Sequence, residues 1–549
     1  MLSFACVVLL LLVVINVLQA NTNTSSSNNE RKAYPSTILT ASVKKNEKRK
    51  LALEFQTELE RRSKLSRDVR TVEEFWQERN KIANLEVKQL LGNSLLLDES
   101  EVEANKIILS KKYEEYNKAL DPNEIFPPSR PFMEVKEMIE QSDIFKIIKK
   151  LPKGASIYCT VLTIVGFEFY YQLTFEDNLY FLFDDKLYFK YSRSKPSPKW
   201  KLLSHIRETD DNPQFIEDLN NEIKASLGIV SIKTWPTDPV LSQDKLSDFV
   251  RLRLSLMKYK PNFIRCIRNA LENLYEDNVM YAEINLEFPE LYDLDGNTYD
   301  PVSVLRLCKT ILDDFKKTHK DFLGVRFYYV SETYTVKDVG EYRKVANDLW
   351  KANPNLIAGV GIIADKEALS DYVEELLKFP KEINIFIYTG FTNNWGIDLD
   401  YNILNALVLS VDSIEEAFAM NKHPFIVEEL RKNNIPIKIS PIQSQILNYV
   451  KDLRSHPASI LIATNYPVVI GSIGSTIANA TGLSENWYEA YMAITPRFCD
   501  IRCLKQFAIN SWLYCTLPVE EKKKAISAWE DKWDAFIEDV IIDWATKKS

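Results

Sequence analysis

The feature that most constrains the fold is an alternation of short apolar runs with amphipathic stretches. Past residue 131, runs rich in β-branched and aromatic residues, such as VMYAEINLEF and LIAGVGIIA, are separated by helical patterns such as SDYVEELLKF and HPFIVEELRKN. Repeated strand–helix alternation predicts a parallel sheet with helices packed against it. Because the alternation continues over about 400 residues, we expect an α/β fold in which the sheet closes into a (β/α)8 barrel.

Two segments depart from this alternation. From Lys48 to about Leu120 the pattern is helical, and Asp98 with Glu101 three residues later has the spacing of a capping box. The proline-rich stretch DPNEIFPPSRP then marks a boundary. A second segment, rich in Phe and Tyr, interrupts the barrel after its first strand. We therefore predict an N-terminal helical domain at residues 21–128, a barrel at 129–545, and a small inserted module at 167–225.

The N-terminal sequence indicates the cellular location of the protein. Residues 1–18 are almost entirely apolar, and Gln19-Ala20 is followed by the polar run NTNTSSSNNE. This pattern predicts a secretory signal peptide at residues 1–20. The alternative is an uncleaved anchor, although the stretch is short for a bilayer span of about 20 residues. Asn23 and Asn479 begin N-glycosylation sequons, which suit a secreted glycoprotein. We expect an extracellular protein that does not enter the membrane.

The charge of the chain limits the partners that it can bind, and its cysteines limit the disulfide bonds that it can form. Lysine and arginine number 69 against 77 aspartates and glutamates, a formal net charge of −8, which argues against nucleic-acid binding. Six cysteines follow the signal peptide and permit 15 disulfide connectivities. Cys159 lies in an apolar run and is expected to be a buried free thiol. Cys499 and Cys503 are four residues apart, a spacing that places two side chains on one helix face.

Several long segments carry a family resemblance. They include LPKGASIY, LENLYEDNVMYAEIN, PELYDLDGNTYDP, NKHPFIVEELRKNNIPIKISPIQSQIL and TGLSENWYEAYMAI. Over about residues 50–535 the chain resembles the secreted adenosine deaminases, also called adenosine deaminase-related growth factors. The resemblance implies a barrel of the metal-dependent amidohydrolase type with an N-terminal dimerisation domain and a receptor-binding insertion. It also implies a zinc-activated water, held by histidine and aspartate ligands, that converts adenosine to inosine.

The positions that match the family's zinc ligands carry other residues here. The first-strand pair of histidines is replaced by Tyr158 and Thr160, on either side of Cys159. The third histidine position is Tyr388, and the aspartate position is Ile473. We therefore expect no metal cofactor. The substituted tyrosines could instead line an aromatic ligand pocket, although filling of the core is the simpler interpretation.

The family's acid–base positions have changed as well. By the same matching, the catalytic glutamate is replaced by Phe391, the water-steering histidine by Glu416, and the purine-binding aspartate by Gly474. The four histidines of the chain form no ligand spacing. Apolar residues at Phe391 and Ile473 can fill an emptied polar site, which indicates conversion of the site rather than damage.

The favoured hypothesis is a secreted growth-factor-type pseudoenzyme that acts by binding. Its partner would be a cell-surface receptor, a glycan, a purine nucleoside, or a second chain in a homodimer or in a heterodimer with an active relative. One alternative is a residual adenosine deaminase. Another is an abundant secreted protein of a body fluid. The adjacent carboxyl groups of Glu415 and Glu416 could serve glycosidic chemistry, but neighbouring strand residues rarely face the same site.

Overall fold

A computed structural model describes residues 71–228, 233, 235–330, 339–363, 368–389, 398–480 and 482–545. The predicted signal peptide, the sequon at Asn23 and the position of Phe391 lie outside the described residues. From Asn80 onward the chain forms one compact unit, which contains the whole barrel and its helices.

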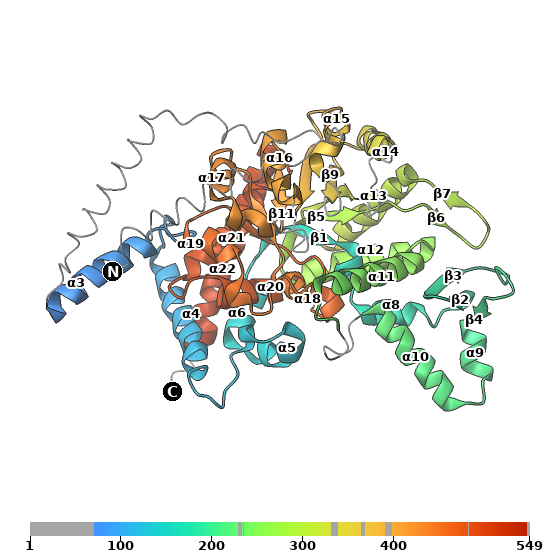
Figure 1. The fold of residues 1–549 in the computed structure, drawn as a ribbon, viewed down its shortest axis with the longest axis horizontal. Coiled ribbons are helices and arrows are strands. Elements are labelled where there is room, and N and C mark those ends of the chain that lie inside the picture. The colour runs from blue at the N-terminus through green and yellow to red at the C-terminus, as the bar shows by residue number, and fades with distance from the viewer. Residues whose placement is uncertain are drawn as a thin grey trace, which may run out of the picture. The chain divides into compact units, whose positions relative to one another are not determined.

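Eight parallel strands form the centre of the molecule (Figure 1). Their order in the sheet is their order in the chain. Each strand pairs in parallel with the next one. The predicted (β/α)8 barrel is therefore confirmed. The strands are β1 (Gly154–Thr160), β5 (Val279–Leu286), β8 (Gly324–Val330), β9 (Ile357–Ile363), β10 (Asn384–Tyr388), β11 (Ser413–Glu415), β12 (Ile437–Ile439) and β13 (Val468–Ile470).

The last strand meets the first and closes the ring. The Ser472 amide donates to the Tyr158 carbonyl oxygen at 2.9 Å. Gly471 permits this approach, since a Cβ atom there would lie 2.6 Å from the backbone oxygen and side chain of Tyr158. The ring closure brings the end of β1 beside the segment that follows β13.

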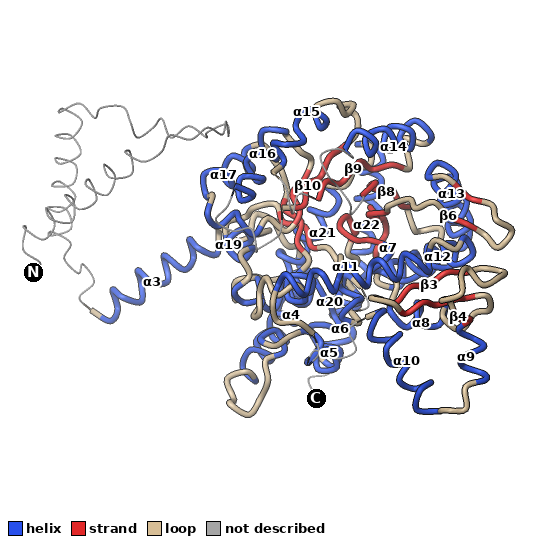
Figure 2. The backbone as a smooth tube through the Cα atoms, turned by 45° about the vertical axis from the view of Figure 1, so that its right-hand side comes forward, coloured by secondary structure: helices blue, strands red, loops and turns tan. Residues whose placement is uncertain are grey.

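Amphipathic helices cover the outside of the barrel (Figures 1 and 2). Helix α12 (Lys260–Glu276) shows why: Phe263, Ile267, Ala270 and Leu274 recur at helical spacing, and all are buried. The other long outer helices are α13 (Pro301–Thr318), α14 (Val339–Ala352), α17 (Pro424–Lys432) and α21 (Ile501–Leu513). The helices after β9 and β10 are shorter: α15 (Val373–Leu376) and α16 (Asn402–Leu409).

A small antiparallel sheet follows the first barrel strand. Its order is β3-β2-β4, with β2 (Leu179–Phe183), β3 (Leu187–Tyr191) and β4 (Lys201–Leu202). Leu179 and Phe181 of β2 are buried in alternation with more exposed neighbours. Four helices accompany the sheet (Figure 2): α8 (Phe167–Leu173), α9 (Leu203–Thr209), α10 (Pro213–Leu227) and α11 (Pro239–Met257).

The N-terminal helices differ sharply in burial. Helix α3 (Val72–Val87) has no buried residue. Helix α4 (Glu99–Lys118) begins at Asp98 with the predicted capping box, in which Asp98 accepts from the Glu101 amide and Glu101 accepts from the Asp98 amide. It packs beside the C-terminal helix α22 (Val519–Ala545), where the Trp533 indole donates to Glu101 at 2.7 Å.

A buried charge cluster lies where strands β1 and β5 begin. The Asp277 carboxylate accepts from Lys149 at 2.9 Å and lies 3.6 Å from the Lys153 ammonium group. It also accepts the Leu483 and Ser484 amides at 2.7 and 3.0 Å, which caps helix α20 (Leu483–Glu489). Burial raises the pKa of Asp277, but the two lysines outweigh this effect and lower it.

All six cysteines in the described residues are buried free thiols, as predicted for Cys159. The expectation that Cys499 and Cys503 share one helix face is wrong. Asp500 is the N-cap of α21, so the helix begins at Ile501 and Cys499 precedes it. Within the described residues, no helix is long and apolar enough to cross a membrane.

Candidate functional site

The ends of the barrel strands bring together most of the residues singled out by the sequence. Because the strands are parallel, their carboxyl ends lie on one side of the sheet, where barrel enzymes carry their active sites. Tyr158 and Thr160 end β1, Tyr388 ends β10, and Glu416 directly follows β11. Ile473 follows β13, which the ring closure places beside β1.

Glu416 is the centre of a buried hydrogen-bond network. One carboxyl oxygen accepts the Ser440 amide at 2.9 Å and the Tyr158 hydroxyl at 3.3 Å. The other accepts the Ser444 hydroxyl at 3.2 Å. Burial nevertheless raises the pKa of Glu416 to about 8, although all three donors lower it. The site therefore holds a carboxyl group that is easily protonated and that is surrounded by hydroxyl and amide donors.

His456 stands behind this carboxyl group. Its Nδ1 accepts the Ala458 amide at 3.1 Å, so the proton resides on Nε2. Nε2 lies 3.2 Å from the Ser444 hydroxyl, to which it donates, and Ser444 in turn donates to Glu416. Burial lowers the pKa of His456 to about 3, so the ring is neutral at physiological pH. The chain of contacts runs from histidine through serine to glutamate.

The backbone at Glu416 has the left-handed conformation that favours glycine. Glu416 has a φ of 66° and Ala417 a φ of 38°. The family resemblance places a glycine at Ala417. Its replacement by alanine keeps the turn but adds local strain, which a non-glycine residue tolerates only within well-packed surroundings. Ala417 is fully buried. The turn places the Glu416 side chain at the end of the barrel, beside Tyr158, whereas the preceding side chain has a different partner.

That preceding residue, Glu415, faces a second cluster. Its carboxyl group lies 3.7 Å from the Lys438 ammonium group, and both side chains are about 1% exposed. Lys438 also lies over the rings of Tyr328 and Phe386, at 5.2 and 5.3 Å from their centroids. Burial raises the pKa of Glu415 to about 8, against the opposing effect of Lys438. Glu415 and Glu416 thus have separate partners and do not form a glycosidase-like pair.

The remaining predicted positions surround the network without joining it. Tyr388 is buried, and burial together with Tyr449 raises its pKa. The Ile473 carbonyl accepts the Ser440 hydroxyl at 2.9 Å, and the Gly474 amide donates to Thr163 at 3.0 Å. Asn479, the second sequon, is exposed on the segment after β13. Thr160 is half-buried at the end of β1, where its carbonyl oxygen accepts the Thr163 hydroxyl at 3.5 Å.

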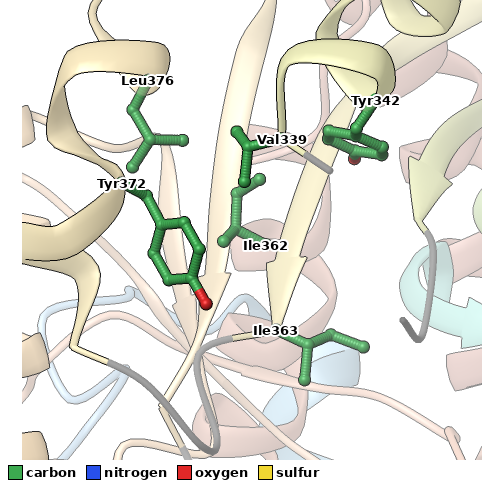
Figure 3. Close-up of a pocket in the computed structure, with 6 residues that line it drawn as sticks. All are labelled: Val339, Tyr342, Ile362, Ile363, Tyr372 and Leu376. Atoms are coloured by element: carbon green, nitrogen blue, oxygen red, sulfur yellow. The ribbon is translucent and has the colours of Figure 1, made fainter. Parts of the chain in front are cut away.

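Tyr158 and Tyr388 are both buried, and the Tyr158 hydroxyl donates to Glu416. A small apolar pocket lies elsewhere, between α14, β9 and α15 (Figure 3). It is lined by Val339, Tyr342, Ile362, Ile363, Tyr372 and Leu376. None of these residues belongs to the Glu416 network. Filling of the core is the interpretation that the burial of the two tyrosines supports.

The residues present at the strand ends do not fit a zinc ion. Zinc requires neutral imidazole, thiolate or carboxylate ligands with a free lone pair. Tyr158 is a protonated phenol whose hydroxyl donates to Glu416, and Ile473 has no ligand atom. Both ring nitrogens of His456 already have hydrogen-bond partners. No group of three His, Cys, Asp or Glu side chains suited to a metal occurs in the described part of the chain.

Sequence reasoning missed Lys438, Ser440, Ser444 and His456. Lys438, Ser440 and Ser444 lie in one segment already quoted for its family resemblance, but no local spacing connects the four residues. Ser440 and Ser444 are one turn apart at the start of α18 (Pro441–Ile446), and this is the only sequence signal of the network. His456 joins it from a turn that follows a short 3₁₀ helix, where it appears as an ordinary turn residue.

Comparisons with known proteins define the class and then the family. The fold is similar to that of the Arabidopsis ADAL protein in complex with IMP, with a TM-score of 0.50, 12% identity, and coverage of 71% of this chain and 99% of that one. This likeness concerns the fold alone and agrees with an eight-stranded α/β barrel.

The sequence comparisons are more specific. The family model for the N-terminal region of adenosine/AMP deaminases matches residues 8–148. An adenosine deaminase of Aedes albopictus is 31% identical over 87% of this chain and 91% of its own length. Human adenosine deaminase 2 is also 31% identical, over 82% of this chain and 91% of its own length. The chain belongs to the adenosine deaminase family that includes adenosine deaminase 2.

Proposed function

We propose that this chain is a secreted pseudoenzyme of the adenosine deaminase family that carries no zinc and acts by binding. One observation supports the proposal above all: Glu416 and Tyr158, at two positions of the family's site, are hydrogen-bonded to each other and to the protein. The side chains that should face a metal and a substrate are instead partners in a closed internal network. The predicted signal peptide supports secretion.

The first test measures zinc and deamination together. The full-length protein would be secreted from cultured cells and purified without chelator, with the related Aedes albopictus adenosine deaminase prepared in parallel as the active control. We expect far less than one zinc per chain and no inosine above the rate without protein. About one zinc per chain, or inosine formed at a rate that scales with protein concentration, would establish the alternative of a residual deaminase.

Restoring the family's residues tests whether the former zinc site has been repacked around new residues or has only lost its ligands. We expect a variant with all seven positions restored to bind some zinc but to deaminate adenosine poorly, because the supporting residues have also changed. Full activity in that variant would mean that only the ligands had been lost. The substitutions are Tyr158→His, Thr160→His, Tyr388→His, Phe391→Glu, Glu416→His, Ile473→Asp and Gly474→Asp.

A second protein chain is the kind of partner that the surface of the molecule supports best. Helix α3 exposes apolar side chains at Phe75, Trp76 and Ile82, about half of each being accessible. A helix with apolar residues and no buried face requires a partner surface, and symmetric pairing is the commonest solution. We propose that α3 contributes to a homodimer, or to a heterodimer with an active relative.

Light scattering tests this contact. The double variant Phe75→Ser/Trp76→Ser should be monomeric at concentrations where the unaltered protein is dimeric. Leu96→Ser is the matched control, because Leu96 is almost fully exposed outside any helix. An unaltered protein that is monomeric at micromolar concentration would exclude the dimer. Saturable binding to cells, to glycans or to adenosine would then identify a different partner class, whereas no saturable binding would favour the bulk secreted protein.

A further inference from the structure

The second N-glycosylation sequon lies in the segment that follows strand β13. It reads Asn479-Ala480-Thr481, which is the acceptor pattern for N-linked glycans. Asn479 is exposed, whereas Ile477, Ala478 and Ala480 around it are buried. A glycan is bulky and needs an acceptor side chain that reaches solvent. The segment therefore presents the asparagine to solvent while its neighbours pack against the protein.

The backbone of this segment is held in a defined turn. The short 3₁₀ helix η9 (Ser475–Ala478) precedes the asparagine. Asn479 has a φ of 60°, in the left-handed region that asparagine tolerates better than most residues. Directly after it, the Ala480 amide donates to the Ser475 carbonyl oxygen at 3.2 Å. A glycan on Asn479 would thus be attached to an ordered turn of the barrel.

This turn stands at the carboxyl end of the barrel. Helix η9 contacts α7 (Val161–Ile164), which directly follows β1, and α18, which follows β12. The Gly474 amide donates to the Thr163 hydroxyl of α7 at 3.0 Å. A 3₁₀ helix rises about 2 Å per residue, so the segment separates Asn479 from Gly474 by about 10 Å. Gly474 and Ile473 are the positions of two family aspartates, so the acceptor lies close to the former zinc site.

We propose that Asn479 carries an N-linked glycan in the secreted protein and that this glycan covers the carboxyl end of the barrel. An N-linked glycan is bulky, hydrophilic and confined to the surface around its acceptor. The strand ends would then be shielded from large partners, and the surface used for binding would lie elsewhere. The inference rests on the secretion proposed above, because the secretory route adds such glycans.

The modification transfers an oligosaccharide from its lipid diphosphate carrier. A bond forms between the anomeric carbon of the first sugar and the Nδ2 atom of Asn479. The bond from that carbon to the diphosphate breaks, and the lipid diphosphate leaves with the bonding electron pair. The Nδ2 atom loses one proton to the surrounding water. No group is oxidised or reduced, so the carrier-bound oligosaccharide is the only co-reactant.

Peptide mapping tests the occupancy of Asn479. Trypsin cleaves after Arg454 and Arg497, and the resulting peptide 455–497 contains no other sequon. The full-length protein from culture medium would be digested before and after treatment with peptide N-glycosidase in ¹⁸O-labelled water. We expect the peptide to carry glycan masses before treatment and a labelled aspartate at position 479 afterwards. An unmodified peptide from the secreted protein would overturn the glycan.

Variants of the sequon show whether the motif itself decides the result. Asn479→Gln and Thr481→Ala should each leave peptide 455–497 without a glycan. Thr481→Ser preserves the acceptor pattern and should keep the glycan. Asn23→Gln is the matched control, because it removes the other sequon and should leave peptide 455–497 unchanged. A glycan that persists on this peptide in Thr481→Ala would exclude the sequon as its acceptor.

An introduced thiol measures whether the glycan covers the barrel end. Ile473 is partly exposed, and the six cysteines of the described residues are buried, so Ile473→Cys supplies an accessible thiol. A polyethylene-glycol maleimide should label it several-fold more slowly than the double variant Ile473→Cys/Thr481→Ala. N-ethylmaleimide, a small reagent, should label both variants at similar rates. Equal rates with the large reagent would contradict the covering of the barrel end.

A second preparation separates failure of the glycan from failure of secretion. Absence of the chain from culture medium would count against the proposed secretion. The chain would then be made with residues 1–20 replaced by the signal peptide of an unrelated secreted protein, and the mapping repeated. An unmodified peptide 455–497 in that preparation would overturn the inference. The zinc and deaminase results would stand unaffected.

Discussion

Two buried carboxyl groups of the same barrel are held in opposite electrostatic surroundings. Asp277, where β1 and β5 begin, has two lysines and two backbone amides as partners, and its pKa is lowered. Glu416, where β11 ends, has one backbone amide and two hydroxyls, and its pKa is raised to about 8. Asp277 also accepts the Ser484 hydroxyl, so it has more partners than Glu416, and only the partners of Asp277 include cations.

The difference shows what kind of change the strand ends have undergone. Burial of an ionised carboxylate is costly unless a cation compensates for it. At the strand starts, lysines provide that cation. At the strand ends, the family resemblance places a zinc ion, but the residues found here offer neutral donors. Burial without a cation stabilises the protonated form of a carboxyl group even against these donors, so Glu416 can be held without a metal.

The largest effect is expected from removing the charge-compensated carboxylate. Asp277→Ala would leave the buried Lys153 ammonium group without its counter-charge and would uncap α20, which should reduce the free energy of unfolding by about 3–5 kcal/mol. Urea denaturation at pH 7 measures this change. The control is Asp314→Ala, which removes an exposed ion pair with Lys317 and should leave the free energy of unfolding almost unchanged. Equal losses in the two variants would show that the buried Asp277 cluster stabilises the protein no more than an exposed ion pair does.

The next prediction concerns the pH dependence that Glu416 creates. Its pKa is about 8 in the folded protein and near 4.3 when unfolded, so its contribution to stability is complete below pH 4 and is lost as the pH rises towards 8. Glu416→Gln does not titrate and preserves the acceptor oxygen. Relative to the unaltered protein, this variant should gain about 2–4 kcal/mol between pH 5 and pH 8. A constant difference across this range, measured by thermal and urea unfolding, would contradict a raised pKa.

A single step back towards the family's ligands should fail. Tyr388→His places an imidazole in a buried position that lacks the other ligands, and an unpaired polar group there costs about 1–3 kcal/mol. The variant should be less stable and should produce no inosine with zinc supplied. Thermal unfolding and the deaminase assay provide the two measurements. Deamination by this single variant would show that the strand ends retain the metal geometry.

The smallest effect is expected within the network itself. Tyr158→Phe removes one hydroxyl donor from Glu416 and leaves the Ser440 amide and Ser444 in place, at a cost of about 1 kcal/mol. The pKa of Glu416 should rise further, because the hydroxyl lowers it. The pH profile of unfolding should therefore shift to higher pH. An unchanged pH profile would show that the Tyr158 hydroxyl does not affect the pKa of Glu416.

Local patterns in the sequence accounted for the barrel but not for its weakest strand. The longer strands have runs of apolar residues, which predict them directly. Strand β11 is three residues, Ser413–Glu415, and two of them are polar. It is held by pairing with β10 and β12, so its existence depends on neighbours distant in the chain. The capping box at Asp98 and Glu101 was predicted because both partners lie within one helical turn.

The Glu416 network could not be assembled from sequence for the same reason. Tyr158 is 258 residues from Glu416, and Ser444 is 28 residues from it. The resemblance identified Tyr158 and Glu416 as changed positions, but only the folded chain shows that they are bonded to each other. The pairing of Lys438 with Glu415 likewise depends on the register between β11 and β12, two strands of three residues each that lie in separate segments of the chain.

The contact between Glu101 and Trp533 has a consequence for how the chain is made. The two residues are 432 positions apart, yet they join helices α4 and α22 side by side. A ribosome that adds about 5–20 residues per second needs roughly 20 to 90 seconds to cover that interval. During this time α4 has been synthesised but its partner helix has not, so its inner face depends on chaperones or transient contacts. Translation must finish before the N-terminal helix can dock, and a chain that stops short of α22 presents that uncovered face to cellular quality control.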